Sequence, residues 1–274
     1  MIKIAVIPVA GYGIRFLPIT KAVPKEMLPI IDRPVIDFIV EEAIESGIEE
    51  IIFVTSKKKK AIKKYFGKAK KLKKYLIKKQ KNNELIQLEK TYKKAKITYV
   101  LQNEMKGLGH AVLLTQNITK GEPFVLMLGD DMYNNNSSNV TTQLINSYKN
   151  VKKTVLGTIE IDIKDSNKYG ICEPESKINH LIKLRSVIEK PDHINAPSNI
   201  AISGRYILTP KIYNYLKTQK PGKDGEIQLT DAINRLISEE DVFAKIIKNK
   251  RYDIGTKADY VEAILDSSKL RKLM

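Results

Sequence analysis

Short apolar runs alternate with segments of helical periodicity through the first half of this 274-residue chain. The apolar runs predict strands at residues 3–9, 51–55, 97–101 and 124–128. The periodic segments predict helices at residues 35–46 and 110–116. Strands and helices in this order indicate an α/β fold with a mostly parallel sheet and helices on both faces.

The pattern loosens after about residue 150. A strand is predicted at residues 155–161, short strands at 171–173 and 187–189, and a helix at 227–238. No internal repeat and no Ser/Gly-rich linker divides the sequence, so we expect residues 1–274 to form a single domain. No membrane span is expected, because no apolar run reaches about 18 residues. No signal peptide is expected at the N-terminus either.

The net charge of +17 is concentrated in one segment. Residues 57–96 contain 18 lysines and two glutamates, a net of +16, which leaves about +1 for the rest of the chain. Apolar residues recur there with a helical period, from Ile62 through Phe66 and Ala69 to Leu72 and Leu76. We interpret the segment as a helical excursion with a solvated lysine face. The alternative is a basic nucleic-acid-binding protein centred on this segment, although few aromatic residues are present to stack on bases.

A glycine-containing turn follows the first predicted strand. Gly11 and Gly13 would lie at the carboxyl edge of the sheet, where a bare backbone can point N–H groups at anionic oxygens. Phe16 stands where a dinucleotide-binding loop has its third glycine, and no Walker lysine follows. The turn therefore predicts a phosphate site of another kind, with an ordinary strand-to-helix turn as the alternative.

Two cations follow the glycine turn on a stretch stiffened by prolines. Arg15 and Lys25 lie 10 residues apart, with Pro18, Pro24 and Pro29 around them. Arginine can fork onto phosphate oxygens and lysine acts as a point charge, a combination suited to a triphosphate.

The fourth predicted strand runs into Gly129, Asp130 and Asp131. Carboxylates at this position would share the carboxyl edge of the sheet with the glycine turn. Mg²⁺ is usually bound by one or two carboxylates together with substrate phosphates and water. Asp130 is the first candidate ligand, with a polar turn closing the strand as the alternative. The single cysteine, Cys172, excludes an intramolecular disulfide and is best explained as a small buried residue.

Two motifs carry a family resemblance. The run from Ala10 to Pro18, followed by Pro-Lys-Glu-Met-Leu-Pro at residues 24–29, resembles the signature of bacterial UTP–glucose-1-phosphate uridylyltransferases. Sugar nucleotidyltransferases in general share Gly-x-Gly-x-Arg and Pro-Lys, and the longer second motif narrows the match to the uridylyl group. Ile14 stands where the family usually has threonine, so one hydroxyl that could bond a phosphate is absent.

The resemblance implies a Rossmann-like three-layer sandwich of the nucleotide-diphospho-sugar transferase type. It implies a Mg²⁺-dependent reaction in which UTP and glucose 1-phosphate give UDP-glucose and pyrophosphate. It also implies a cytoplasmic homo-oligomer that binds neither nucleic acid nor membrane. Another sugar-1-phosphate nucleotidyltransferase, using dTTP or a different hexose phosphate, is the alternative function.

The resemblance also implies roles for individual residues, carried over at matching positions. Catalysis is expected from Arg15, Lys25, Asp130 and Lys190, and nucleotide binding from Ala10, Gly11, Gly13, Glu26, Gln102 and Gly107. Sugar binding is expected from Gly170, Glu189, Lys190 and Asn199, and metal binding from Asp130 with Asp253 as a second ligand. A primary amide such as that of Gln102 offers the donor and the acceptor that match the imide edge of uracil.

Overall fold

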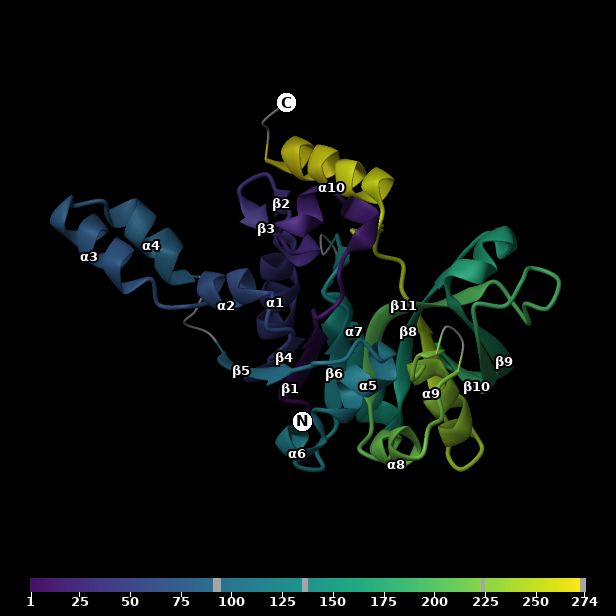
Figure 1. Cartoon of the computed structure of the whole chain (residues 1–274). Coiled ribbons are helices and arrows are strands. Elements are labelled where there is room, and N and C mark those ends of the chain that lie inside the picture. Colours follow the sequence, from purple (N-terminus) through teal and green to yellow (C-terminus); the bar gives the residue numbers. More distant parts are fainter. Residues whose placement is uncertain (91–94, 135–137, 223–224, 272–274) are drawn as a thin grey trace.

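The computed structural model describes residues 1–90, 95–134, 138–222 and 225–271, and its centre is a nine-stranded mixed sheet (Figure 1). The strand order is β5-β4-β1-β6-β11-β8-β12-β10-β9. The strands are β1 Ile4–Pro8, β4 Glu50–Thr55, β5 Lys96–Leu101, β6 Phe124–Met127, β8 Val155–Glu160, β9 Gly170–Ile178, β10 Leu181–Glu189, β11 Ile200–Leu208 and β12 Phe243–Ile246. The expected α/β class with a central mixed sheet is confirmed.

The four strands predicted in the first half form the parallel part of the sheet. β1 lies between β4 and β6, and β5 flanks β4, all in parallel register. The β1, β4 and β6 sequences are nearly continuous apolar runs because both of their faces are covered. Parallel strands end at one edge, so the loops after β1, β4, β5 and β6 all open on the same side.

The second half adds strands that are largely antiparallel to their neighbours. β11 pairs antiparallel with both β6 and β8, and β12 runs parallel to β8. The short strands predicted at 171–173 and 187–189 were underestimated, since they are the inner ends of a hairpin of two nine-residue strands, β9 and β10. The outer part of β9 is exposed at residues 174–178, so it carries no apolar signal.

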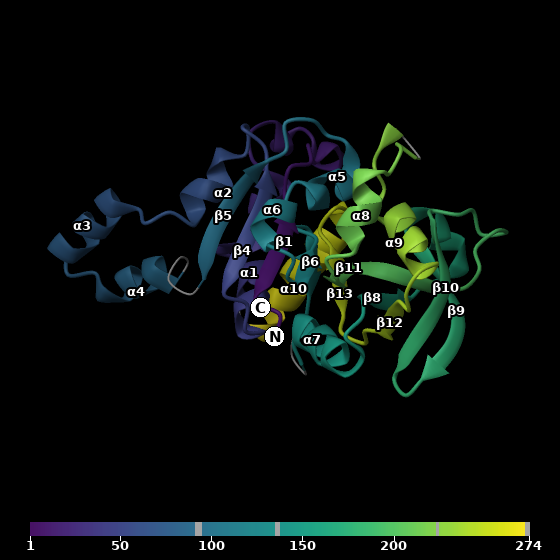
Figure 2. The same cartoon turned by 90° about the horizontal axis from the view of Figure 1, so that it is seen from below.

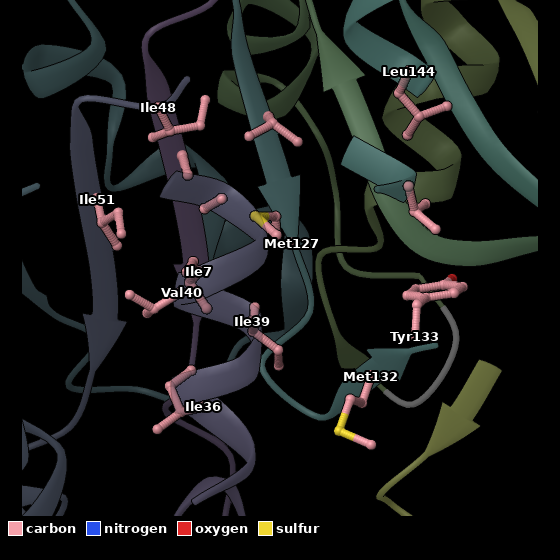
Figure 3. Close-up of a cluster of buried hydrophobic side chains, with 14 of the residues drawn as sticks. Ile7, Ile36, Ile39, Val40, Ile48, Ile51, Met127, Met132, Tyr133 and Leu144 are labelled. Carbon is pink, nitrogen blue, oxygen red and sulfur yellow. The ribbon is translucent and has the colours of Figure 1, made fainter. Parts of the chain in front are cut away.

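Helices cover both faces of the sheet. One face carries α1 Val35–Glu45, α7 Val140–Val151 and α10 Lys257–Leu270, and the other carries α5 Gly107–Leu113, α8 Ile212–Lys217 and α9 Leu229–Ile237. A hydrophobic core lies on each face of the sheet, and successive side chains of β1 point into alternate cores. Ala5 and Ile7 pack on the α1 side, and Val6 packs on the α5 side. Figure 3 shows α1 lying across the sheet, with Ile36, Ile39 and Val40 among the side chains of this core.

Two predicted helices have different bounds in the structure. The helix expected at 110–116 is two helices, α5 and the short α6 Gln116–Thr119. The helix expected at 227–238 begins two residues later, as α9.

Two small ribbons lie outside the main sheet, as do three 3-10 turns in the segment after β1 and a fourth 3-10 turn at Ile163–Lys168. Antiparallel pairing joins β7 Asp131–Tyr133 to β13 Arg251–Asp253, and β2 Pro29–Ile30 to β3 Arg33–Pro34. The turns after β1 span Ile14–Phe16, Ile19–Lys21 and Lys25–Met27. These elements carry much of the polar chemistry described below.

The lysine-rich segment forms three helices, α2 Lys60–Tyr65, α3 Lys70–Lys78 and α4 Asn82–Lys90. In Figures 1 and 2 the α3–α4 pair extends away from the sheet; we call α2–α4 the arm. The segment is helical, as the sequence predicts, but it is divided into separate helices, because the chain breaks after α2 and Ala69 adopts a left-handed φ of 39°. Leu76 is buried, whereas Leu72 keeps 49% of its surface exposed. Residues 91–94 of the predicted excursion lie outside the described residues.

Within the described ranges, no helix is long and apolar enough to cross a membrane.

Candidate functional site: a charged cleft at the carboxyl edge of the sheet

The glycine turn follows β1 directly and leaves open space beside its backbone. A side-chain carbon built on Gly11 would meet no atom within 4 Å, so a ligand can approach the main chain there. Gly13 has φ 68° and packs against Lys25 and Thr20, where a built side-chain carbon would lie 3.2 Å from each. The turn therefore combines an open glycine with one that the left-handed backbone requires.

Lys25 reaches from its 3-10 turn to Asp130 at the end of β6. The Lys25 ammonium forms a short ion pair with Oδ2 of Asp130, and each side chain is about four-fifths buried. Burial favours the neutral form of both groups, but the charge and hydrogen bond of the partner outweigh it. The pKa of Asp130 consequently lies below its usual value and that of Lys25 above it. Both groups are therefore held charged at neutral pH.

A second buried ion pair joins Glu26 to Lys59. The Lys59 Nζ atom lies 2.8 Å and 2.7 Å from the two carboxylate oxygens of Glu26, and neither side chain exceeds 8% exposure. Burial raises the pKa of Glu26 and lowers that of Lys59, and each charge offsets the effect on the other only in part. Sequence reasoning missed Lys59, because nothing distinguishes it from the three lysines beside it.

The β7–β13 ribbon brings Asp253 alongside the Gly-Asp-Asp segment. Asp253 is in register with Asp131, and the Ile254 N–H donates to the Asp130 carbonyl at 2.8 Å. The Asp253 carboxylate accepts a hydrogen bond from the Gly255 N–H at 2.8 Å. A side-chain carbon built on Gly255 would lie 2.7 Å from Oδ1 of Asp253 and 3.1 Å from the Arg15 guanidinium. Arg15 is thus directed toward the Asp253 loop.

Gln102 and Gly107 lie at the end of β5 and the start of α5. The Gln102 amide is buried, and its Nε2 lies 3.2 Å from the Gly107 carbonyl and 3.1 Å from Nδ1 of His110. Gly107 has φ 89°, and a side-chain carbon there would lie 2.7 Å from Cβ of Glu226. Glu226 was not anticipated from the sequence as part of this region.

The predicted sugar-binding residues gather at the β9–β10 end of the sheet. Gly170 opens β9 opposite Glu189 on β10. Glu189 accepts a hydrogen bond from Thr230 at 2.5 Å and lies 3.4 Å from the Lys190 ammonium. Asn199 is exposed, and its carbonyl accepts from the Ile161 N–H at 3.0 Å.

Eight of the predicted residues line one cleft of about 350 Å³. They are Ala10, Gly11, Gly13, Lys25, Glu26, Gln102, Gly107 and Asp130. Glu226, Met105, Leu108 and Tyr12 are among the other lining residues. The remaining predicted residues do not line this cleft: Arg15, Gly170, Glu189, Lys190, Asn199 and Asp253. The structure thus brings together all six residues expected to bind nucleotide, with Lys25 and Asp130.

The carboxylates fit a metal site that is completed by a substrate. Within the part of the chain that the structure describes, no group of three or more His, Cys, Asp or Glu side chains could hold a metal ion. Asp130 is held ionised, and Asp253 lies on the ribbon strand next to its segment. One or two carboxylates completed by phosphate oxygens and water is the usual arrangement for Mg²⁺.

The fold and the cleft define the class of protein, a nucleotidyl transferase, and the family model of that description matches residues 4–269. UTP–glucose-1-phosphate uridylyltransferase 1 of Staphylococcus saprophyticus is 45% identical over 96% of this chain and 92% of its own. A relative of the same name from Staphylococcus epidermidis is 44% identical over 97% of this chain and 92% of its own. The chain belongs to the family of UTP–glucose-1-phosphate uridylyltransferases.

Solved structures agree with this assignment. A UDP-glucose pyrophosphorylase complexed with UDP-glucose superimposes with a TM-score of 0.90 at 38% identity, covering 98% of this chain and 99% of the other. The UTP-bound enzyme of Acinetobacter baumannii gives a TM-score of 0.90 at 35% identity, with 98% and 94% covered. Enzymes of the nucleotidyl transferase family generally use a divalent metal ion.

Proposed function

We propose that this protein joins UTP and glucose 1-phosphate to give UDP-glucose and pyrophosphate. The observation that carries the proposal is the cleft itself, where an open glycine turn, a buried amide and the Lys25–Asp130 pair face one space. The identity of 45% to a uridylyltransferase over 96% of the chain supports the choice of substrates.

The nucleotide would lie along the cleft with its phosphates at the glycine turn. The backbone at Ala10, Gly11 and Gly13 would offer N–H groups to phosphate oxygens, and at Gly11 no side chain stands in the way. Gln102 and Gly107 at the other side of the cleft would read the uracil, since an amide supplies both a donor and an acceptor. The carboxylate of Glu26, which lines the same cleft, would accept a hydrogen bond from the nucleoside.

Asp130 and Asp253 would hold Mg²⁺, and the bound ion would supply charge neutralisation for the phosphate groups. Lys25 engages one oxygen of Asp130, so cation and carboxylate enter the reaction as a preformed pair. Their mutual attraction keeps both charges in place without the reorganisation that water would need.

The reaction would be an in-line attack by a phosphate oxygen of glucose 1-phosphate on the α-phosphorus of UTP. That oxygen is ionised at neutral pH, so no general base is required, and the protein contributes positioning and charge neutralisation. Arg15 and Lys25 would stabilise the charge that gathers on the leaving pyrophosphate. Lys190 would hold the attacking phosphate, and the Glu189 carboxylate would accept hydrogen bonds from the hexose hydroxyls, with Gly170 and Asn199 beside them.

Pyrophosphate release with a panel of substrates tests the proposal. The purified chain with Mg²⁺ should release pyrophosphate most rapidly from UTP plus glucose 1-phosphate. Replacing UTP by dTTP, or glucose 1-phosphate by another hexose 1-phosphate, should lower kcat/KM by at least about tenfold, since each loses a matched polar contact. A preference for dTTP would instead assign the chain the neighbouring thymidylyl activity.

We also propose that the protein acts in the cytoplasm as a homo-oligomer and binds neither membrane nor nucleic acid. Its only cysteine, Cys172, is a buried free thiol, in keeping with a reducing compartment. Exposed apolar side chains on the arm, including Tyr75 and Ile86, are suited to a contact between subunits. Sedimentation of the purified chain measures the assembly directly.

A further inference from the structure

A buried acid, an arginine and a tyrosine form a bracket that the proposed reaction does not use. Asp131 follows the metal candidate Asp130 and has a side-chain exposure of only 2%. Nε of Arg251, on β13, lies 2.6 Å from Oδ1 of Asp131. The Arg251 guanidinium also sits 5.4 Å from the centre of the Tyr169 ring and donates weakly to the Tyr169 hydroxyl at 3.4 Å.

The bracket connects two parts of the proposed site: Asp131 lies near the candidate metal carboxylates, and Tyr169 lies near Lys190. Asp131 and Arg251 lie on the β7–β13 ribbon, which also carries Asp253 and bonds the Asp130 carbonyl. Tyr169 immediately precedes β9, and its carbonyl accepts a hydrogen bond from the Lys190 N–H at 2.9 Å. Arg251 therefore contacts both the ribbon that carries the candidate metal carboxylates and the tyrosine whose carbonyl is bonded by Lys190.

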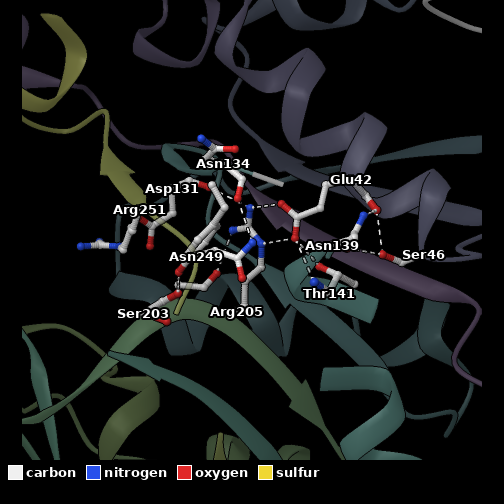
Figure 4. A network of polar contacts seen from close by, with 12 residues as sticks. Glu42, Ser46, Asp131, Asn134, Asn139, Thr141, Ser203, Arg205, Asn249 and Arg251 are labelled. Carbon is white, nitrogen blue, oxygen red and sulfur yellow. Dashed lines mark hydrogen bonds and ion pairs between the residues drawn. The ribbon is translucent and has the colours of Figure 1, made fainter. Parts of the chain in front are cut away.

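Asp131 is itself held by two arginines (Figure 4). Arg251 contacts its carboxylate, and Arg205 on β11 donates to its carbonyl at 2.8 Å. Arg205 is fully buried and paired with Glu42 of α1 at 2.8 Å. Gly204 leaves room for the carboxylate, since a side-chain carbon there would come within 1.8 Å of Oδ2. The Asp131 end of the bracket is thus fixed to the core.

Such an arrangement costs desolvation free energy that an apolar contact of similar volume would avoid. What a guanidinium provides in addition is a fixed planar geometry that can meet a carboxylate and an aromatic ring at once. Fixed geometry matters here because an in-line transfer between two substrates depends on the separation of the groups that hold them.

We propose that Arg251 is a positioning residue that sets the metal-binding carboxylates at the correct separation from Lys190. The inference rests on the proposed function. Without Arg251 the β7–β13 ribbon and the β9–β10 end would each keep their other contacts. The distance between them would no longer be fixed by a side chain that contacts both. Nucleotide binding in the cleft should persist, since Arg251 does not line it.

Kinetics of Arg251→Lys and Arg251→Met test this, with glucose 1-phosphate, UTP and Mg²⁺ varied separately. For Arg251→Met we expect the KM for glucose 1-phosphate and the half-saturating Mg²⁺ concentration each to rise about tenfold. The Kd for UTP, measured by titration calorimetry without the sugar phosphate, should change by less than about twofold. Arg251→Lys should fold normally and give a smaller shift, because an ammonium can reach Asp131 but cannot also cover the Tyr169 ring.

A second measurement separates positioning from a structural role. Arg251→Ala assayed with added guanidinium at low millimolar concentration should recover several-fold activity, whereas ammonium at the same concentration should not. The matched control is Arg185→Met, which removes an exposed arginine of β10 with only a loose 3.5 Å contact to Glu173 and should leave all parameters unchanged.

The outcomes distinguish this inference from the function on which it rests. A wild-type chain that releases no pyrophosphate from any sugar phosphate and nucleotide pair would refute the proposed function. An active wild type whose Arg251→Met and Arg251→Lys variants keep their KM and Mg²⁺ requirement, with only a lower Tm, would overturn the positioning role alone.

Discussion

The arm and the cleft both depend on lysine, yet they use it in opposite ways. The arm carries many exposed lysines, and their contacts with acidic side chains include Lys73 with Glu89 at 2.5 Å and Lys81 with Glu84 at 3.6 Å. In the cleft region Lys25 and Lys59 are mostly buried, and each is bound to a carboxylate. A few enclosed charges therefore indicate function better than a dense exposed run does.

The two regions differ in how much each charged side chain contributes to stability and binding, and the cause is solvent exposure. Exposed charges interact through a high dielectric and are screened by salt, so each contributes little to stability or to binding at a distance. A buried charge interacts strongly with its neighbours, and it must be paired or the site is destabilised. The comparison can be tested by substituting buried, paired side chains and exposed ones and comparing the effects.

The largest effect is expected from Lys59→Met. Glu26 would remain nearly fully buried without its counter-ion, and breaking such a pair typically costs about 3–5 kcal/mol of unfolding free energy. Urea denaturation measures the loss, and Lys60→Met, an exposed neighbour in the same lysine run, is the control. The double variant Lys59→Met with Glu26→Gln should be more stable than Lys59→Met alone, because no lone charge stays behind. Equal stability of all three variants would contradict the buried pair.

Asp130→Asn should lower kcat about 10²–10³-fold, since removing one preorganised charge contact costs that much in comparable sites. The amide keeps the shape of the carboxylate but attracts neither Lys25 nor a metal ion, so the fold should persist by circular dichroism. Asp165→Asn, at an exposed carboxylate paired with Lys168, should leave kcat unchanged. Full activity of the Asp130 variant in Mg²⁺ would remove Asp130 from the site.

Gln102→Leu should raise the KM for UTP about tenfold, the size expected when one or two matched hydrogen bonds are lost. Discrimination between UTP and other nucleoside triphosphates should weaken by a similar factor. Gln87→Leu replaces the same side chain on the exposed surface of α4 and serves as the control. If both variants bind UTP as the wild type does, the base is recognised elsewhere.

The sequence was sufficient to predict the features that follow from strand ends. The apolar runs of β1 and β6 were recognisable, and parallel strands end at one edge, so the glycine turn and Asp130 were expected to meet. Gln102, which follows β5, was expected there from the family resemblance. Their shared cleft agrees with that expectation. The roles of the individual residues stay predictions until they are measured.

Features that depend on distant partners could not be predicted. Lys57, Lys58, Lys59 and Lys60 are chemically identical, and only packing against Glu26 decides that the third of them turns inward. The strand β11 is buried along its whole length but is interrupted by Gly204 and Arg205, so its apolar signal was weak. The partner of Arg205 is Glu42, which lies 163 residues earlier in the sequence.

The smallest effect is expected where the charge is densest. Lys70, Lys71, Lys74 and Lys78 share one face of α3, and all four are exposed. Changing all four to glutamine should keep kcat/KM within about twofold, and the unfolding free energy should stay the same or rise slightly as like-charge repulsion is relieved. The rate should also stay unchanged between about 50 and 250 mM salt, a range over which a nucleic-acid contact through these lysines would weaken steeply. A loss of activity exceeding that of Gln102→Leu would show that the arm takes part in the site, and the contrast between exposed and enclosed lysines would fail.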